Sequence, residues 1–329
     1  MQWNSTKVLV TGAGGFIGSH LVERLVILGA KVKAFVRYNS TNSWGWLDTF
    51  PKELQSEIEI CRGDIRDFYS LNNTLKDIDI IFHLAALIAI PYSYKSPESY
   101  IKTNIEGTLN ILHAGLNNEI KRIVHTSTSE VYGSAQYVPI DEKHPLYAQS
   151  PYSATKIGAD KLAESFYLSF NLPVSIIRPF NTYGPRQSLR AVIPTIILQA
   201  LTTNIIKIGD VTPTRDLTYV EDTVDGFIKI VESPNSIGEI INVGSNFEIA
   251  IRDLVIKIGN LLNKELIIDS QEERFRPSKS EVERLWADNS KAKKLLGWKP
   301  KYSIDEGLKL TIDWLKENIS KYKPEIFNI

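Results

Sequence analysis

The sequence predicts an α/β fold, in which a doubly wound parallel sheet is joined to a smaller C-terminal lobe. Three observations support this prediction. An apolar strand over residues 8–10 enters a glycine-rich turn, and strand and helix patterns then alternate to about residue 179, as in parallel sheets connected by helices. From residue 180 the strands are short and interrupted by proline and glycine. We therefore expect a sheet domain over 1–179 and a lobe over 180–329, with one or more segments near 205–245 returning to the main sheet.

The turn after the first strand contains three glycines, Gly12, Gly15 and Gly18, with the spacing G-x-x-G-x-x-G. Such glycines let the chain turn sharply, bring bare backbone close to a pyrophosphate and pack the next helix on the sheet. Glycines at this spacing also occur in ordinary tight turns. Here a helix over 16–28 follows at once and a strand over 32–36 completes a βαβ unit. The sequence therefore predicts an NAD(P)-binding Rossmann domain.

Two charged residues follow the next strands. Arg37 stands where an NAD-binding unit has an acidic residue for the ribose 2′-hydroxyl. Its guanidinium group would pair with the 2′-phosphate of NADP, stack on adenine or lie in solvent. Asp64 follows the strand predicted over 57–61 and would accept a hydrogen bond from adenine or cap a helix.

The strand predicted over 78–84 ends in small residues, Ala85 and Ala86. Small side chains let a cofactor lie against the backbone, so we expect these two residues to border the nicotinamide ribose. His83 has apolar neighbours and is interpreted as a core histidine rather than a catalytic residue.

A strand over 122–126 ends in a cluster of hydroxyl groups, and a helix begins at about residue 151. Tyr152 and Lys156 are four residues apart and therefore share one face of this helix. We expect the Lys156 ammonium group to lower the pKa of the Tyr152 phenol from about 10, which makes the phenol a usable base. A solvated helix face is the alternative, but the glycine turn and the hydroxyl cluster favour catalysis.

The chain resembles the extended short-chain dehydrogenases/reductases, in the branch of sugar-nucleotide epimerases and dehydratases. The resemblance covers residues 7 to about 314. Its motifs are TGAGGFIG at 11–18, HLAA at 83–86, STSEVYG at 127–133, Tyr152 with Lys156, RPFNTYGP at 178–185, RDLTYVED at 215–222 and LGW at 296–298. It implies that Thr128, Tyr152 and Lys156 move a hydride and a proton at carbon 4 of a hexose.

The resemblance also implies a tightly bound NAD or NADP that is regenerated in each turnover, and a homodimer that pairs the helices near 101–117 and 153–170. The expected cofactor-binding residues are Gly12, Gly15, Phe16, Ile17, Gly18, Arg37, Asp64, Ile65, Leu84, Ala85, Ala86, Tyr152 and Lys156. On the substrate side we expect Asn181 to bond phosphate or sugar. Arg215 and Arg276 are expected to bind the diphosphate, because a guanidinium fork matches its oxygens.

Glu130 separates the classes within this branch. A 4-epimerase needs no carboxylate there, whereas a 4,6-dehydratase must remove the proton on carbon 5 once carbon 4 is a ketone. Glu130, two residues after Thr128, would be that base; capping of local N–H groups is the alternative. Glucose-type dehydratases pair an Asp with the Glu, but this chain has Ser129, like the similar GDP-mannose dehydratases, so the acid for the leaving hydroxyl stays open.

The stretch 87–94 is apolar and would suit an acetamido methyl group, although packing alone also explains it. With 37–46 and 274–286, it resembles dehydratases of the legionaminic-acid pathway. The sequence thus predicts a 4,6-dehydratase of UDP- or GDP-N-acetylglucosamine. The alternatives are a 4-epimerase, a reductase of a related keto or 5,6-unsaturated nucleotide sugar, and a non-catalytic cofactor-sensing protein.

The composition excludes several other classes. Lys plus Arg and Asp plus Glu number 38 each, so no net field attracts nucleic acid or an acidic membrane. The single cysteine, Cys61, excludes an internal disulfide and is interpreted as a core residue. The polar start of the chain and the lack of long apolar runs predict a cytoplasmic protein. No cluster of metal ligands stands out, so we expect no metal.

Three further charged residues in the lobe are not expected to take part in the chemistry. Arg186 is expected to be a solvated loop charge, and Asp216 and Asp222 are expected to form structural pairs or caps rather than to act as acids. A late strand over 239–243 should return to the main sheet, and an apolar-faced helix should follow over 251–263.

Overall fold

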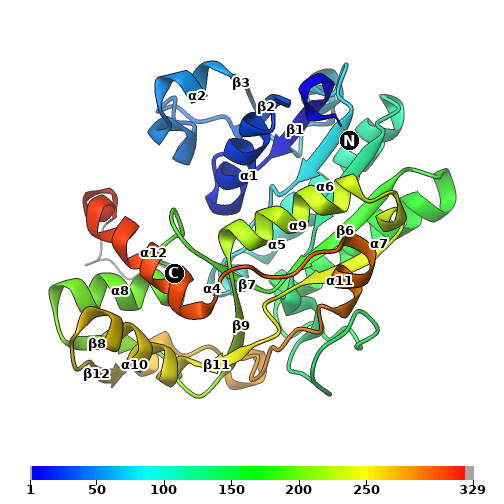
Figure 1. Ribbon diagram of the computed structural model, residues 1–329. Helices are drawn as coiled ribbons and strands as arrows, with labels where there is room; N and C mark the ends of the chain where they lie inside the picture. Colours follow the sequence, from blue (N-terminus) through cyan, green and yellow to red (C-terminus); the bar gives the residue numbers. More distant parts are fainter. Residues whose placement is uncertain (1, 323–329) are drawn as a thin grey trace.

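The computed structural model of the protein describes residues 2–322. Its main element is a seven-stranded sheet with the order β10-β6-β5-β4-β1-β2-β3, in which all neighbouring strands are parallel (Figure 1). The strands are β1 (Lys7–Thr11), β2 (Lys31–Arg37), β3 (Ile58–Gly63), β4 (Ile80–His83), β5 (Arg122–Thr126), β6 (Val174–Pro179) and β10 (Ile240–Val243). The chain moves outward in one direction through β2 and β3 and in the other through β5 and β6. The doubly wound fold is therefore confirmed, with its switch point between β1 and β4, where ligands bind in such sheets.

Helices cover both faces of this sheet, because side chains along each strand point alternately to the two faces. Val8 and Val10 of β1 pack in one core with Leu21 and Phe227, whereas Leu9 between them packs in a second core with Leu71, Ile111 and Ala163. The first core is covered by α1 (Phe16–Ile27) and α9 (Val220–Glu232), and the second by α3 (Phe68–Thr74), α6 (Gly107–Asn117) and α7 (Pro151–Phe170). Short helices α2 (Lys52–Ser56), α4 (Ile90–Lys95) and α5 (Pro97–Tyr100) lie in the connections.

The long helix expected before β5 is present, with one change of hydrogen-bonding pattern. It begins as α5, continues through the π-helical turns Ile101–Glu106 and ends as α6. The side chain of Asn104, in the π-helical part, is buried and bonds both the N–H and the carbonyl of Leu87. The irregular stretch therefore holds the segment that leaves β4.

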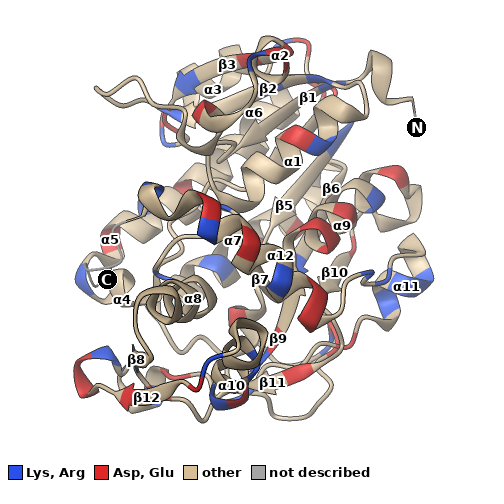
Figure 2. Ribbon diagram, turned by 60° about the vertical axis from the view of Figure 1, so that its left-hand side comes forward, with Lys and Arg blue, Asp and Glu red and all other residues tan. Residues whose placement is uncertain are grey.

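The second lobe lies below the main sheet in Figure 1. Strands β11 (Glu248–Ala250), β9 (Thr214–Tyr219) and β7 (Asn181–Tyr183) form one small sheet, and β12 (Ile267–Ser270) pairs with β8 (Ile205–Ile208) in another. The helices of the lobe are α8 (Val192–Thr202), α10 (Ile251–Leu262), α11 (Ser290–Leu296) and α12 (Ile304–Asn318). Figure 2 shows that α8 carries no charged residue, which fits its central place in this lobe.

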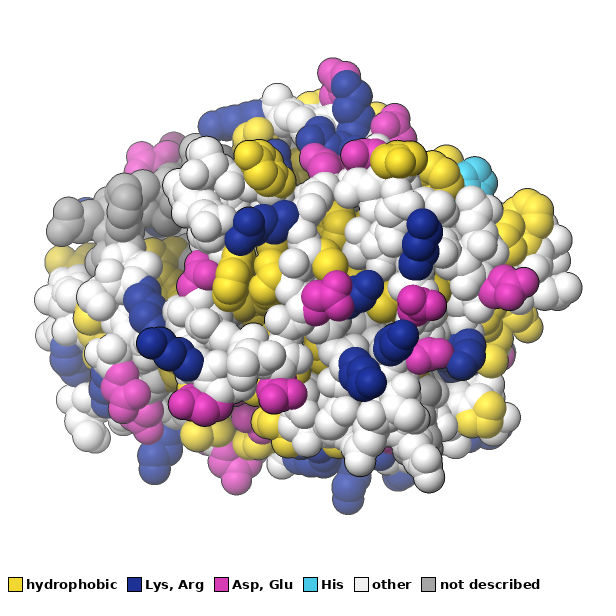
Figure 3. Space-filling model, turned by 90° about the horizontal axis from the view of Figure 1, so that it is seen from above, with side chains coloured by type: hydrophobic (Ala, Val, Ile, Leu, Met, Phe, Trp, Pro, Cys, Tyr) yellow, Lys and Arg dark blue, Asp and Glu magenta, His cyan; other side chains and the backbone are white. Residues whose placement is uncertain are grey.

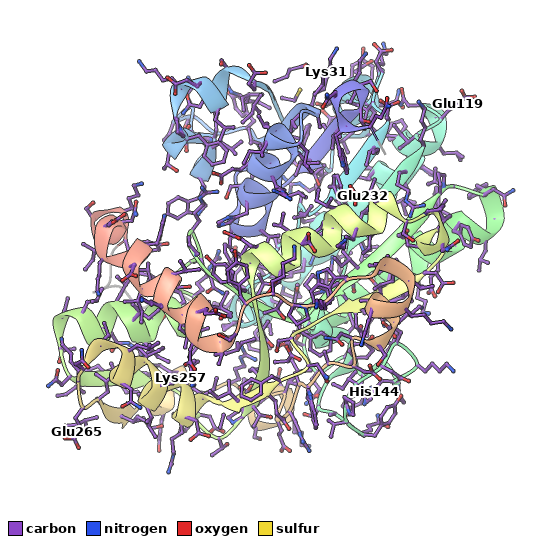
Figure 4. All side chains as sticks on the ribbon, in the orientation of Figure 1. Lys31, Glu119, His144, Glu232, Lys257 and Glu265 are labelled. Atoms are coloured by element: carbon purple, nitrogen blue, oxygen red, sulfur yellow. The ribbon has the colours of Figure 1, made fainter. Side chains whose placement is uncertain are left out.

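Of the segment near 205–245, helix α9 and strand β10 pack with the main sheet, whereas β8 and β9 belong to the lobe. The side chains of β8 alternate between exposed and buried, as on a half-exposed sheet and unlike a central parallel strand. In Figure 4, Lys31 of β2 and Glu232 of α9 mark the sheet domain, and Lys257 of α10 and Glu265 mark the lobe.

The surface agrees with the balanced composition. Figure 3 shows basic and acidic side chains interspersed on the face seen from above. Within residues 2–322, no helix is long and apolar enough to cross a membrane. Cys61 is only half-buried, at the edge of the second core, so its interpretation as a core residue is wrong: β3 is the outermost strand of the sheet, where burial is incomplete.

Candidate active site

A cavity of about 1560 Å³ contains the candidate site. The glycine turn, the ends of β2, β3, β4, β5 and β6 and the start of α7 form one side, and second-lobe residues between Phe180 and Glu281 form the other. The volume exceeds the roughly 300–1,000 Å³ of a pocket for one small ligand. There is therefore room for a dinucleotide and a second nucleotide-linked molecule together. Every residue predicted to bind the cofactor, to bind the substrate or to react lines this cavity.

The glycine turn fits a pyrophosphate. Gly12 has a φ of +69°, in the region that favours glycine, and a Cβ on Gly18 would lie 2.2 Å from the Gly12 carbonyl oxygen. The first turn of α1 has no acidic residue, and its N-cap Gly15 supplies no side-chain bond. The free N–H groups at this helix start thus point at the cavity without a protein acceptor, as anion-binding helix termini do.

The two charged residues at the adenosine end, Arg37 and Asp64, have different surroundings. Arg37 is exposed at the end of β2. Asp64 accepts hydrogen bonds from Arg66 Nε at 2.9 Å and Nη2 at 2.5 Å. The alternative that Asp64 caps a helix is wrong, because Asp67 caps α3 and accepts a bond from Ser70 N. Asp64 is one turn too early in the chain for that role.

His83 is a buried core histidine, as expected. Thr108 donates its hydroxyl hydrogen to Asn104 O and so accepts from His83 Nε2, 3.1 Å away. Thr11 accepts the N–H groups of Leu84 and Ala85 and so donates to His83 Nδ1 at 2.8 Å. Burial lowers the pKa of His83 well below its usual value. The neutral ring thus ties β1 to β4 at the switch point.

Tyr152 and Lys156 are placed by the start of α7. Ser150 and Ser153 form a capping box there, which fixes where the helix begins. Thr128, two residues after β5, lies close enough to the Tyr152 hydroxyl group to favour its ionised form. Lys156 Nζ donates to the backbone carbonyl of Thr126, 2.5 Å away. The three predicted side chains therefore converge at one wall of the cavity.

The electrostatics of this group differ from the prediction. Burial raises the pKa of Tyr152 above its ordinary value, the Thr128 hydroxyl group opposes this and the nearby Glu130 charge adds to it. The expected phenol pKa below 10 is therefore not found, because burial outweighs the groups that favour the phenolate. The ammonium group is bound to Thr126, and the phenolate loses more hydration than its neighbours replace. Burial also lowers the pKa of Lys156 to about 8, with Asp160 opposing the shift.

A buried ion pair lies beneath the catalytic helix. Asp160, one turn after Lys156, accepts bonds from Arg178 Nη2 at 2.9 Å and Ser127 Oγ at 2.7 Å. His125 Nε2 lies 3.3 Å from its other oxygen. Burial raises the pKa of Asp160, but His125 and Arg178 outweigh it and bring the value down to about 2. This anchored carboxylate joins α7 to β5 and β6.

On the substrate side, Arg215 and Arg276 share one partner. Arg215 Nη2 lies 2.8 Å and Arg276 Nη1 lies 3.4 Å from Glu281 Oε1. Asn181 lines the cavity with a buried Oδ1 that has no hydrogen-bond partner in residues 2–322. Two guanidinium groups and an amide thus face the cavity from the second lobe.

Arg186 is not the solvated charge that the sequence predicts. Its Nη2 lies 2.7 Å from Glu23 of α1, and its guanidinium group stacks over Phe50 at 4.9 Å. Two chain segments far apart in the sequence meet there, which periodicity cannot show. Asp216 and Asp222 are structural, as expected: Asp216 accepts the N–H groups of Ser245, Asn246 and Ala287, and Asp222 those of Lys301 and Tyr302.

The comparisons with known proteins follow this geometry. A family model described as GDP-mannose 4,6 dehydratase matches residues 9–311. The chain belongs to this family. It is 35% identical to UDP-glucuronate 4-epimerase of Thermodesulfobacterium geofontis over 96% of this chain and 98% of the relative. Among solved structures, UDP-glucuronic acid 4-epimerase of Bacillus cereus with UDP-glucuronic acid and NAD has a TM-score of 0.87 and 32% identity, over 95% of this chain and 100% of that one. The dTDP-glucose 4,6-dehydratase DesIV of Streptomyces venezuelae with NAD has a TM-score of 0.84 and 28% identity, over 97% and 99%.

Membership of the GDP-mannose 4,6 dehydratase family confirms the resemblance to sugar-nucleotide epimerases and dehydratases. It makes the chain an enzyme of that superfamily with a nicotinamide dinucleotide cofactor, and both solved relatives hold NAD. Epimerases and dehydratases are similarly close to the chain. Family membership therefore does not distinguish epimerisation from dehydration.

The sequence pointed to the segments 37–46 and 274–286 but did not predict two contacts made there. The loop over 39–49 lies on the glycine turn: Trp46 N donates to Gly14 O at 2.9 Å, and a Cβ on Gly14 would lie 2.3 Å from Trp44 O. The feature of the sequence that indicates this loop is the presence of aromatic residues in an otherwise polar stretch. The role of Glu281, the shared partner of the two arginines, could not be recognised from its neighbours in the sequence. It depends on Arg215, which is 66 positions before it, and on Arg276, which is 5 positions before it.

Proposed function

We propose that the protein is a 4,6-dehydratase of a nucleotide-activated hexose. One observation carries the proposal: Glu130 lies in the cavity wall, only 9% exposed, between Thr128 and Tyr152. In residues 2–322 no hydrogen bond or ion pair reaches its carboxylate, and the cap of its short helix is Thr128. Glu130 interacts with the charge of Arg215 without pairing directly with it. A buried carboxylate with no hydrogen bond or ion pair of its own is costly unless function requires it.

The residues divide the work as follows. Tyr152 takes the proton of the 4-hydroxyl group, with its oxygen held by Thr128 and the adjacent Lys156 charge stabilising the phenolate that forms. NAD, when bound, would accept the hydride from carbon 4 and donate it back at carbon 6. Once carbon 4 is a ketone, the proton on carbon 5 is acidic, and Glu130 removes it. The hydroxyl group on carbon 6 leaves as water.

The leaving hydroxyl needs a proton, and Ser129 is too weak an acid to supply one. Its hydroxyl is buried beside the carboxylate that has just been protonated. We therefore assign both proton steps to Glu130, which takes the carbon 5 proton and gives it to the departing oxygen. After the hydride taken from carbon 4 returns at carbon 6, carbon 5 takes a proton from solvent through Glu130, and Tyr152 releases the 4-hydroxyl proton to solvent. Atoms then balance: the net change is the loss of one water.

The sugar is proposed to be N-acetylglucosamine, linked to UDP or GDP. The segment from Leu87 to Tyr92 forms an apolar lip of the cavity and ends in helix α4. Ile90 packs in one cluster with Tyr100 and Tyr152, and Leu87 packs against it. This places an apolar wall beside the reacting tyrosine, where an acetamido methyl group would gain contact.

For the cofactor we propose NAD, with Arg37 free to stack on adenine from its exposed position. We also propose a homodimer through the segments 101–117 and 153–170. Ile101 is 46%, Leu168 76% and Phe170 52% exposed, which is much apolar surface for two adjacent helices. A scattering mass of one chain at micromolar concentration would contradict the dimer.

The test is mass spectrometry of the purified protein incubated in heavy water with UDP- or GDP-N-acetylglucosamine. Loss of one water with gain of one deuterium is expected for one of the two nucleotides. An unchanged mass with an altered sugar configuration would instead establish a 4-epimerase. No change with either substrate would sink the dehydratase proposal for this sugar.

A further inference from the structure

A group of hydrogen bonds connects the diphosphate arginines to the start of the catalytic helix. The short segment 277–281, here called the strap, carries Ser280 and Glu281 and directly follows Arg276. Two backbone bonds to Pro277 O, from Ser280 N at 2.7 Å and Glu281 N at 3.1 Å, shape it into a tight turn. None of these contacts belongs to the core of either lobe.

Gln149 is the residue to which the strap is attached. Its Nε2 atom donates to the carbonyl oxygens of Lys279 and Glu281, each at 3.1 Å. The backbone carbonyl of Gln149 accepts a hydrogen bond from the Ser280 hydroxyl at 2.5 Å. On the other side, its Oε1 atom accepts Ser134 N at 2.5 Å. Gln149 thus uses side chain and backbone to join three separate chain segments.

The connection continues to the lip of the cavity. Since Ser280 gives its one hydroxyl hydrogen to Gln149, the 2.6 Å contact with Tyr94 has Tyr94 as donor. Tyr94 lies in α4 and packs in the cluster that contains Tyr152. The strap therefore contacts both the residue before the N-cap of α7 and the apolar lip.

The other end of the strap holds the arginines. Glu281 Oε1 pairs with Arg215 at 2.8 Å and with Arg276 at 3.4 Å. Arg215 is buried and cannot move without breaking that ion pair. Glu281, Ser280, Gln149 and Ser150 thus form a continuous series of bonds from the two guanidinium groups to the helix that begins with Pro151 and Tyr152.

We infer that Gln149 and Ser280 are positioning residues, which fix the distance between the diphosphate arginines and the Tyr152 hydroxyl. This rests on the proposed binding of substrate diphosphate at Arg215 and Arg276. A sugar nucleotide anchored by its diphosphate presents carbon 4 to Tyr152 only if the two ends of the site keep one spacing. A misplacement of about 1 Å can cost about a hundredfold in rate.

The test compares Ser280→Ala with Ser280→Thr in the NAD-loaded protein. The alanine variant loses both hydroxyl bonds, and we expect kcat to fall about 10- to 100-fold. The dissociation constants of UDP and GDP, measured calorimetrically, should stay within about twofold, because the arginines and Glu281 are intact. Ser280→Thr keeps the hydroxyl group and should restore kcat.

Gln149→Glu is the second variant, with nearly the same shape. It keeps the acceptor for Ser134 but places an oxygen against the carbonyls of Lys279 and Glu281, so it should give the same loss of kcat at unchanged diphosphate affinity. Unchanged kcat in both variants would overturn the inference. So would a loss of UDP and GDP affinity equal to the loss of kcat, since that indicates binding rather than positioning.

The two proposals fail in different ways. A wild-type protein that releases no water from any nucleotide sugar contradicts the dehydratase. The ratio of variant to wild-type kcat, taken on whichever nucleotide-sugar reaction the wild type catalyses, still decides the role of the strap.

Discussion

Lys156 donates a hydrogen bond from its Nζ atom to the backbone carbonyl of Thr126, and so joins the catalytic helix to the last residue of β5. The bond fixes the ammonium group beside the cavity, although burial lowers its pKa to about 8. Lys156 is thus both a structural tie between helix and sheet and the charge nearest the reacting groups on its own helix.

Replacement of Lys156 by Met separates these two roles. The variant keeps the length of the side chain but loses the charge, so we expect turnover to fall by about 10²–10⁴. Steady-state assays with the nucleotide sugar measure this loss, and circular dichroism checks the fold. Lys156→Arg keeps a positive charge and should retain more activity than Lys156→Met; equal activity in the two variants would contradict the electrostatic role.

Glu130→Gln tests the dehydratase mechanism at its second step. The amide keeps the shape of the side chain but cannot take the carbon 5 proton, so water release should fall by about 10²–10⁴. Oxidation at carbon 4 should persist, because Thr128, Tyr152 and Lys156 are unchanged. The expected result is reduced cofactor that accumulates on substrate addition, seen by its absorbance. A variant that still releases water at the wild-type rate would remove Glu130 from the mechanism.

Local patterns predicted the parts of the protein that depend on neighbours in the sequence. The strand before the glycine turn, the helix that follows it and the Tyr152–Lys156 pair all lie where periodicity and spacing place them. Strand β5 was predicted to the residue, Arg122–Thr126. These features need no information about distant segments.

The features that the sequence did not predict depend on contacts between distant segments. Arg186 was interpreted as a solvated charge, but Glu23 and Phe50 lie more than 130 residues away along the chain. The high pKa of Tyr152 follows from burial by the whole cavity wall, not from its spacing to Lys156. Burial and long-range ion pairs are properties of the folded chain, and a pattern of residue types does not contain them.

Trp46 fastens the loop over the glycine turn to the second lobe. Its ring lies 5.6 Å from that of Trp314 in α12 and 5.9 Å from that of Tyr322. Its backbone N–H donates a hydrogen bond to Gly14 O. Trp46→Ala should therefore loosen the loop and weaken NAD binding about tenfold, which corresponds to about 1.4 kcal/mol of binding free energy.

The measurement for this variant is the NAD that remains after desalting, together with the dissociation constant from titration of the cofactor-free protein. Trp46→Phe retains a ring for the same neighbours and should bind NAD nearly as the wild type does. If Trp46→Ala and the wild type retain equal NAD, the loop does not contribute to holding the cofactor.

Acid should destabilise the protein through three histidines, the buried His83 and His125 and the partly buried His20. Burial lowers the pKa of His20 to about 4, and also lowers the pKa of His83 and of His125. The folded protein keeps these rings neutral, whereas the unfolded chain binds protons below a pKa of about 6.5. A lowered folded-state pKa means that the unfolded state binds more protons, so stability falls as the pH decreases below about 6.5. At one pH unit below this value His20 and His83 each contribute about 1.4 kcal/mol, or about 3 kcal/mol together, and His125 acts in the same direction.

Urea unfolding at pH 7.5 and 5.5 measures this difference, with the free energy of unfolding lower at the acid pH. His20→Gln removes one titrating ring from the periphery of the site, where His20 Nε2 contacts Pro185 O at 3.0 Å. The pH-dependent loss should then shrink by about 1.4 kcal/mol, since His83 still titrates only in the unfolded chain and His125 still acts in the same direction. A free energy of unfolding that is equal at both pH values would show that these rings take up protons in the folded protein too, which the burial of His83 on β4 and His125 on β5 argues against.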